Sequence, residues 1–326
     1  MDLSRFQSIT RAHLAERAAE LGLDAARLQV EYVLNWGGFV NRSFRVTDGR
    51  TVLHLKLAHE PEIRDALRRY WALRPRLSER YHAPEPVAWV EVPATEYVGV
   101  LSRWVDGAVP ASLDMRMAEE VVAAMTQLHG DRELAAHLPA PAAPLTCADT
   151  YLRTYSERFH ADLAFVEEEN PPFVPASVRE WMRREAEWID AAVAASPAFR
   201  EPADTPMHGD LWLNNLLVTP GGEWFVLDWD NLELGDPAID WAMLFGPSIA
   251  ELRDAMDRPL PAAVTVGAAV RERLALYARA SLLDWIIDPL ADWIDAGEAP
   301  EHVAQVRPEK ERIHRAALAA YRQRYG

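Results

Sequence analysis

The side chains best suited to chemistry lie in one stretch of the chain, residues 206–241. A His-Gly-Asp triplet ends in Asp210, and Asn215 follows five positions later. A Pro-Gly-Gly turn then separates two short apolar runs, and Asp228 closes the second run. A loop, a hairpin and a closing acid in this order can bring the three side chains to one edge of the hairpin. Carboxylate and amide oxygens at such an edge suit Mg²⁺, which binds one or two carboxylates together with phosphate oxygens and water.

The catalytic loop of protein kinases has the same order of groups: an Asp, an Asn five residues later, and then a metal-binding Asp. Gly209 stands where that loop has an arginine. The chain also carries Asp228-Trp229-Asp230 and a Gly-Asp-Pro-x-x-Asp run at residues 235–240. With these motifs the chain resembles the aminoglycoside phosphotransferase family, which includes choline, homoserine and fructosamine kinases. The composite is a specific signal, whereas His-Gly-Asp alone is a weak one.

This resemblance implies an α+β, bilobal protein-kinase-like fold. We expect a small nucleotide-binding lobe with an antiparallel sheet at residues 1–103, and a larger, mainly helical lobe for catalysis and substrate binding at 104–326. The activity it implies is transfer of the γ-phosphate of MgATP to a hydroxyl of a small molecule, such as an aminoglycoside, an amino alcohol or a sugar derivative. The acceptor stays open, because fold and motif specify chemistry and not substrate.

The resemblance also implies a role for each residue of the motif. Asp210 is expected to accept or orient the proton of the acceptor hydroxyl, while Asn215 and Asp228 would hold Mg²⁺ on the phosphates. Asp230 competes with Asp228 as a metal ligand, and we favour Asp228 because it directly ends the apolar run. Asn214 could replace Asn215, but the five-residue spacing selects Asn215.

The N-terminal third of the chain predicts the parts that would grip the nucleotide. A helix is expected at residues 3–21, followed by three strands at 29–36, 43–46 and 51–57. Gly37 and Gly38 lie between the first two strands, where glycines let a backbone approach phosphates, although a plain hairpin turn is the alternative. Lys56 lies late in the third strand, where kinases place the lysine that binds the phosphates.

A kinase-like lobe also needs an acidic side chain that pairs with this lysine, and a hinge segment that binds the nucleotide base. Residues 60–81 are expected to form a helix, on which Glu62 and Asp65 are candidates to pair with Lys56. A solvated surface carboxylate is an equally good interpretation of each. Two further strands, at 87–92 and 97–101, should lead into a hinge where Ser102 and Trp104 would line the base through backbone groups.

The C-terminal part has the periodicity of helices, which are expected at 111–129, 146–166, 177–195, 262–287 and 300–324. Asp236 precedes a proline and is expected to cap a helix, and a structural role is also expected for Asp240. Asp288-Pro289 predicts a helix break followed by a new helix.

Two acids and two indoles near that break, Asp284, Trp285, Asp292 and Trp293, could hold an ammonium group. Core tryptophans beside solvated acids are the favoured interpretation of the four.

Composition narrows the class of protein further. The chain has 326 residues, a net charge of -16 and a single cysteine, Cys147. We therefore expect neither a nucleic-acid partner nor a disulfide framework. Nothing in the sequence is typical of a membrane span or a signal peptide, which favours the cytoplasm, where ATP is available. The acidic charge would favour a cationic acceptor weakly, or simply provide solubility.

The sequence leaves two alternatives to a kinase. A nucleotide-binding regulatory protein without turnover would keep the same motifs, and a metal-dependent hydrolase would need a ligand cage that the sequence does not display. The sequence carries no information on the oligomeric state.

Overall fold

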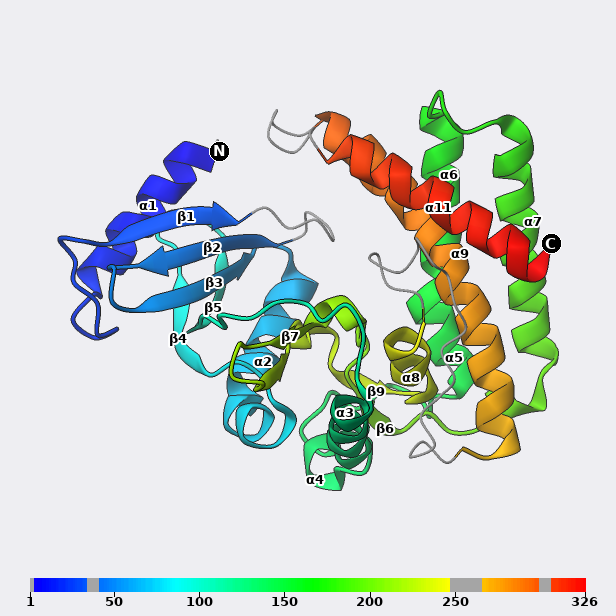
Figure 1. Cartoon of the computed structure of the whole chain (residues 1–326), viewed down its shortest axis with the longest axis horizontal. Helices are drawn as coiled ribbons and strands as arrows, with labels where there is room; N and C mark the ends of the chain where they lie inside the picture. Colours follow the sequence, from blue (N-terminus) through cyan, green and yellow to red (C-terminus); the bar gives the residue numbers. More distant parts are fainter. Residues whose placement is uncertain (1–2, 34–40, 247–265, 299–305) are drawn as a thin grey trace. The chain divides into compact units, whose positions relative to one another are not determined.

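The computed structural model of the chain describes residues 3–33, 41–246, 266–298 and 306–326. Its contacts divide the chain into two compact units (Figure 1). The first, here called the sheet unit, comprises Met1–Ala108 and Leu216–Leu232. The second, called the helical unit, comprises Val109–Asn215 and Glu233–Gly326.

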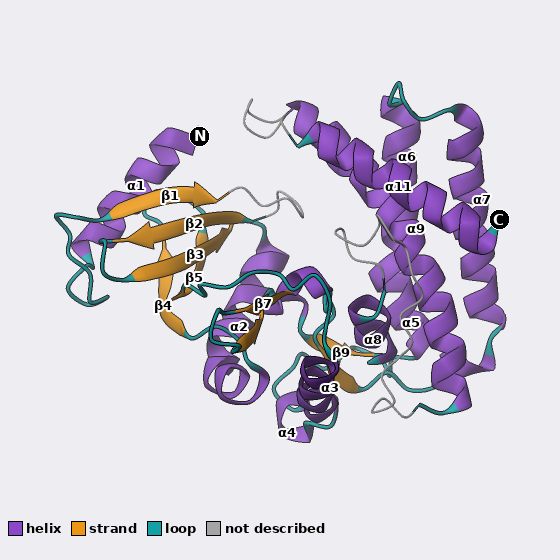
Figure 2. Cartoon of the chain, viewed as in Figure 1, coloured by secondary structure: helices purple, strands orange, loops and turns teal. Residues whose placement is uncertain are grey.

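The sheet unit contains a five-stranded antiparallel sheet in the order β1-β2-β3-β5-β4 (Figure 2). Its strands are β1 (Gln29–Val33), β2 (Arg42–Thr47), β3 (Val52–Ala58), β4 (Pro86–Glu91) and β5 (Val98–Arg103). The central strand, β3, places Lys56 opposite Ser43 on β2 and opposite Val100 on β5. The antiparallel sheet and the mainly helical remainder confirm the predicted α+β class.

Alternation along β3 decides which of its side chains can reach a ligand. Leu53, Leu55 and Leu57 are buried in a core that also takes Phe6 from α1 (Leu3–Glu16). Because successive side chains of a strand point to opposite faces, His54 and Lys56 lie on the other face of the sheet. Burial of the leucines on one face therefore fixes where the lysine points.

Helix α2 (Pro61–Tyr81) crosses from β3 to β4. It ends at His82, whose backbone has the left-handed conformation, with φ 58°. The imidazole of His82 stacks on Trp224, with 3.7 Å between the ring centroids. The backbone carbonyl of His82 accepts a hydrogen bond from the N–H of Val226 at 2.9 Å. Both partners belong to a hairpin made of β7 (Leu216–Val218) and β8 (Trp224–Val226), so the end of α2 anchors that hairpin.

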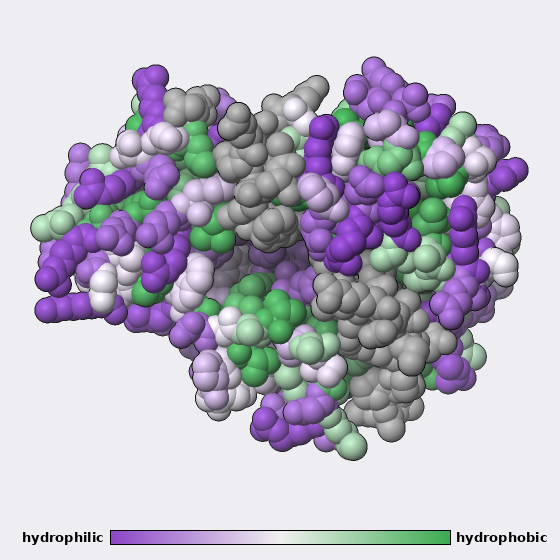
Figure 3. All heavy atoms as spheres, turned by 45° about the horizontal axis from the view of Figure 1, so that its top comes forward, coloured by the Kyte–Doolittle hydropathy of each residue, from purple (hydrophilic) through white to green (hydrophobic). Residues whose placement is uncertain are grey.

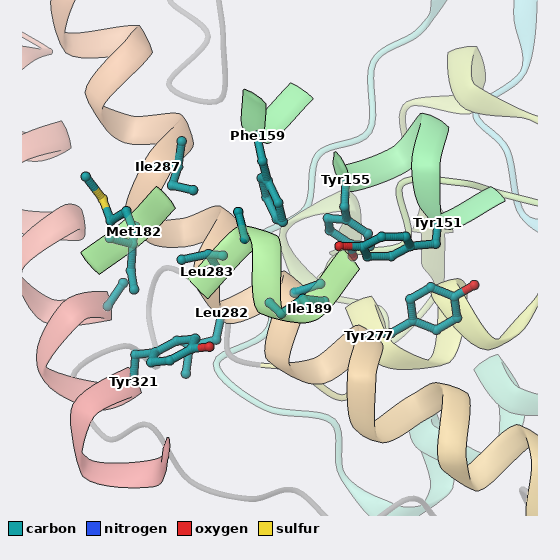
Figure 4. Close-up of a cluster of buried hydrophobic side chains, with 14 of the residues drawn as sticks. Tyr151, Tyr155, Phe159, Met182, Ile189, Tyr277, Leu282, Leu283, Ile287 and Tyr321 are labelled. Atoms are coloured by element: carbon teal, nitrogen blue, oxygen red, sulfur yellow. The ribbon is translucent and has the colours of Figure 1, made fainter. Parts of the chain in front are cut away.

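The helical unit is built from long helices around an aromatic and aliphatic core (Figure 4). Its helices are α3 (Met115–His129), α4 (Arg132–Ala135), α5 (Cys147–Tyr151), α6 (Glu157–Glu169), α7 (Ala176–Ala195), α8 (Ala238–Leu244), α9 (Ala268–Glu298) and α11 (Arg307–Tyr325). A π-helical turn, Leu152–Ser156, joins α5 to α6. Two short strands, β6 (Thr205–Met207) and β9 (Glu233–Gly235), pair with each other in antiparallel orientation. They flank the segment that runs from His208 to Asp230.

The predicted helix break at Pro289 is wrong, because α9 runs without interruption from Ala268 to Glu298. A proline inside a helix costs about 3 kcal/mol, since it lacks an N–H and crowds the preceding turn. The neighbours Ile286, Ile287 and Leu290 are fully buried in the core of this unit. Packing of α9 against α6, α7, α8 and α11 offsets the local penalty.

Among the described residues, no helix is long and apolar enough to cross a bilayer. The space-filling view in Figure 3 shows hydrophilic side chains spread among apolar ones on the face that it presents.

Candidate active site

The β7–β8 hairpin delivers two carboxylates at its exit. Asp228 has a left-handed backbone, with φ 58° and ψ 59°, and a 3-10 turn, Trp229–Asn231, follows it. Trp229 is buried, and its indole N–H donates to the carbonyl of Val226 at 2.8 Å. A left-handed aspartate costs roughly 1 kcal/mol or more and clusters at functional sites. The turn thus fixes the positions of Asp228 and Asp230.

Lys56 is bound to both of these acids. Its Nζ lies 2.9 Å from Asp228 Oδ1 and 2.6 Å from Asp230 Oδ2. Burial alone would lower the pKa of Lys56, but the two carboxylates outweigh it and the pKa is raised. The lysine is therefore charged at every physiological pH, as a group that binds phosphate must be.

The acid expected on α2 does not take part in this arrangement. Asp65 forms an exposed ion pair with Arg68 at 3.0 Å, one turn along its own helix. Within the described part of the chain, Lys56 is paired with the hairpin acids instead of Glu62 or Asp65. Sequence reasoning missed this pairing because 172 residues separate Lys56 from Asp228.

A pocket of the sheet unit surrounds the lysine. Its walls are mainly apolar, with Lys56, Asp228 and Asp230 at its charged end; the other lining residues include Val33, His54, Leu67, Tyr70, Val100, Ser102, Trp104, Leu217 and Leu227. Ser102 and Trp104, which were expected beside a nucleotide base, both line it. Gly37 and Gly38 lie outside the described residues.

Two titratable side chains of the pocket wall are held neutral. Burial and the nearby Lys56 charge lower the pKa of His54 to about 4. Burial also raises the pKa of Tyr70, whose hydroxyl donates to the carbonyl of Pro84 at 2.9 Å. The charge around Lys56 therefore resides in the lysine and the two aspartates. Arg103 also lines the pocket, and its guanidinium is paired with Glu85 at 2.7 Å.

In the helical unit, the predicted spacing of Asp210 and Asn215 closes a small ring. The amide nitrogen of Asn215 donates to the carbonyl of Asp210 at 2.8 Å and to its Oδ2 at 2.9 Å. A 3-10 turn, Leu213–Asn215, brings the two residues together, and Leu213 is buried beneath it. Because the nitrogen is used in this way, the amide oxygen is the atom that Asn215 can offer to a cation.

A buried carboxylate holds the backbone of this loop. Asp240 Oδ2 accepts the N–H of His208 at 2.8 Å, and Oδ1 accepts the N–H of Gly209 at 2.9 Å. His129 Nε2 lies 2.9 Å from Oδ2. Burial would raise the pKa of Asp240, but bonding to His129 and the interactions with His208 offset it and lower the pKa.

The structural role expected for Asp240 is thus borne out, whereas no local signal in the sequence could have located its partner on α3. A structural role is also observed for Asp236. It is fully buried and accepts bonds from the Tyr277 hydroxyl at 2.9 Å and the Ala238 N–H at 3.1 Å. Arg273 Nε lies 2.7 Å from its Oδ2.

The acids considered for an ammonium site already have cationic partners within the chain. Asp284 pairs with Arg158, and Asp292 pairs with Lys310. Burial raises the pKa of Asp284 to about 7 and that of Asp292 to about 6. The guanidinium of Arg307 covers Trp293 at 3.9 Å from the ring centroid. These contacts favour a structural role for the group, but the expectation of solvated acids is wrong, because the side chains of Asp284 and Asp292 are only 11% and 15% exposed.

Comparison with known proteins identifies the family of the chain. Residues 31–283 match the model of the phosphotransferase enzyme family. The chain belongs to this family. The match spans both units, and it confirms the resemblance drawn from the His-Gly-Asp and Gly-Asp-Pro motifs. No curated protein sequence matches the chain significantly.

Solved structures of phosphotransferases share the fold over the whole chain. A candidate aminoglycoside phosphotransferase from Ralstonia eutropha JMP134 is 17% identical, with a TM-score of 0.59 and 97% of each chain covered. A choline/ethanolamine kinase family protein from Mesorhizobium loti is 19% identical, with a TM-score of 0.55, 98% of this chain covered and 99% of its own. Spectinomycin phosphotransferase in complex with ADP and spectinomycin is 10% identical, with a TM-score of 0.61 and 98% of each chain covered. At these identities the likeness establishes the fold alone.

Proposed function

We propose that this phosphotransferase family member moves the γ-phosphate of ATP to a hydroxyl of a small molecule. The observation that carries the proposal is the ring formed by Asp210 and Asn215 on a loop fixed by Asp240. A carboxylate and an amide held rigidly together are what phosphoryl transfer asks of a protein, because its catalysis rests on positioning and electrostatics. The pocket around Lys56 supports the same conclusion.

Asp210 would take the proton of the acceptor hydroxyl. Its bond from Asn215 fixes the orientation of the carboxylate. Lys56 would bind the phosphates of the nucleotide, with Ser102 and Trp104 beside the base. General-base catalysis of this kind contributes about 10²- to 10⁴-fold in rate.

The oxygen donors of the chain fit Mg²⁺. Asp228 is 41% exposed and offers carboxylate oxygens, and Asn215 offers its amide oxygen. No group of three or more His, Cys, Asp or Glu side chains suited to a metal occurs in the described ranges. A site with few protein ligands suits Mg²⁺, which fills its shell with water and phosphate oxygens and neutralises the phosphate charge when bound.

The acceptor belongs to the range of small hydroxyl compounds used by proteins of this fold. One structural relative is named for spectinomycin and another for choline and ethanolamine. The net charge of -16 would raise the local concentration of a cationic acceptor at low ionic strength. We therefore place amino alcohols and amino sugars first, and neutral sugar derivatives second.

The second candidate is a nucleotide-binding regulatory protein without turnover. It is favoured by one observation, which is that Lys56 pairs with the hairpin acids and not with an acid of α2. A pocket organised in this way could bind nucleotide without aligning it for transfer.

The experiment that tests both is release of ADP from MgATP across a panel of amino alcohols, amino sugars and neutral sugars. The Asp210→Asn protein serves as the matched control. We expect release that depends on the acceptor and falls about 10²- to 10⁴-fold in the variant, with nucleotide binding unchanged. Tight nucleotide binding without release for any acceptor would favour the regulatory protein, and absence of nucleotide binding would refute both.

A further inference from the structure

We infer that Asp230 is the positioning residue for Lys56, in the role that the resemblance to kinases assigned to an acid on α2. The inference deepens the proposed function, and it rests on that function only for the statement that Lys56 binds nucleotide phosphates. It separates the two acids of Asp228-Trp229-Asp230, which sequence reasoning treated as alternatives for one metal site.

The two acids differ in how firmly they hold the lysine. Asp230 Oδ2 lies 2.6 Å from Lys56 Nζ, and its side chain is 11% exposed. Asp228 Oδ1 lies 2.9 Å from the same atom, and its side chain is 41% exposed. Asp230 also accepts a longer bond, at 3.4 Å, from the side-chain amide of Asn41, the residue directly before β2. The less exposed acid, which makes the shorter contact, is better suited to a fixed ion pair.

The face of α2 that reaches the pocket cannot supply this acid. It contributes Leu67 and Tyr70 to the pocket wall, and the hydroxyl of Tyr70 is tied to the carbonyl of Pro84. Asp65, one candidate on this helix, is 66% exposed and paired with Arg68. An apolar and aromatic wall thus stands where a helix carboxylate was expected.

This arrangement divides the work between the two acids. Lys56, Asp228 and Asp230 together carry a net charge of -1, which disfavours an anionic nucleotide. A cation that drew on Asp228, the more exposed acid, would leave Lys56 held by Asp230 alone. On charge alone, neutralising Asp230 should strengthen nucleotide binding. If Asp230 positions the lysine, the same substitution should weaken it, so the sign of the effect decides between the two.

The decisive experiment is a double-mutant cycle of nucleotide affinity, measured by calorimetry with ATP in excess Mg²⁺ and with ATP in EDTA. We expect Asp230→Asn to weaken binding by about 10- to 100-fold. This is less than the loss for a buried charge that is left with no partner, because Asp228 still contacts Lys56. In a Lys56→Met background the same change should alter affinity by less than about 2-fold, because no lysine is left to position. Asp230→Glu should restore part of the affinity, and Asp65→Asn is the matched control with no expected effect.

Three outcomes would overturn the inference. Tighter binding by Asp230→Asn would show that only its charge matters. A defect that persists in the Lys56→Met background would show that Asp230 acts on something else. A defect confined to the Mg²⁺ series and relieved by raising the Mg²⁺ concentration would make Asp230 a metal ligand.

A second measurement, on the unliganded protein, separates failure of this inference from failure of the proposed function. The four proteins of the cycle are wild type, Asp230→Asn, Lys56→Met and the double variant. Their thermal unfolding without nucleotide measures the coupling between Lys56 and Asp230. We expect a coupling of at least several-fold in the unfolding constant. Coupling without nucleotide binding would refute the kinase proposal and keep the pair, whereas absence of coupling would refute the pair itself.

Discussion

Replacement of Asp240 by asparagine should lower both the stability of the folded protein and its rate of turnover. The carboxylate is fully buried and accepts the N–H groups of His208 and Gly209, while His129 lies within bonding distance. Asparagine keeps one acceptor oxygen and turns an NH₂ group toward a donor. At least one backbone N–H is then left buried without an acceptor, at about 1–3 kcal/mol, and the lost bond to a charged group adds about 1.5–3 kcal/mol.

The expected loss of unfolding free energy is therefore about 2.5–6 kcal/mol, a large fraction of the ~5–15 kcal/mol of a typical domain. Denaturant unfolding followed by circular dichroism measures it. Asp204→Asn is the matched control, since that side chain is 69% exposed in a 3.8 Å pair with Arg132 and should change stability by less than about 0.5 kcal/mol.

Asp240→Asn should also lower turnover, because the loop it holds carries Asp210. The acceptor-dependent rate should fall at least about 10-fold, while the affinity for nucleotide changes little, since the pocket around Lys56 lies in the other unit. A variant with near wild-type stability and unchanged turnover would refute the claim that Asp240 fixes the loop.

Three further predictions concern other residues. His129→Leu should cost about 1–3 kcal/mol of stability in denaturant unfolding, because it leaves Asp240 short of a partner, and His129→Gln should recover part of the loss. His54 has a folded pKa of about 4 against an ordinary value near 6.5, so the folded state favours its neutral form. The stabilisation provided by neutral His54 is nearly constant above about pH 7 and is lost as the pH falls toward 4. The loss should reach about 2.5 kcal/mol at pH 4.5, measured as the difference in unfolding free energy between wild type and His54→Gln across pH. Gly99→Ala would place a Cβ 1.8 Å from the carbonyl oxygen of Lys56, so thermal unfolding should show severe destabilisation, and a variant as stable as wild type would contradict the close packing of β5 on β3.

Local pattern was enough for most of the fold. Apolar periodicity predicted most of the long helices and the strands of the five-stranded sheet, but it did not predict the short strands β6 and β9 or the short helix α4. The largest error lies where distant packing overrides local preference. The break expected at Pro289 is absent because Ile286, Ile287 and Leu290 are buried among neighbouring helices. Propensity acts through a few adjacent residues, whereas burial of α9 draws on the whole unit.

The motif residues were also identified from the sequence, because their spacing is short. Asp210 and Asn215 are five residues apart, and a single turn joins them. The assignment of catalytic, nucleotide-binding and metal-binding roles to Asp210, Lys56, Asn215 and Asp228 stays a prediction for the experiments above.

The sequence by itself carried the family resemblance, because the resemblance depends on the short spacings of its motifs. From that resemblance came the expected α+β class and the group of residues proposed to transfer a phosphate. Only the tertiary structure decided which other side chains contact and hold these residues. His129 meets Asp240 across 111 residues, and Lys56 meets the hairpin acids across 172. Pairings of this range are set by how elements pack, because each carboxylate of the chain has many candidate partners and only burial and geometry select among them.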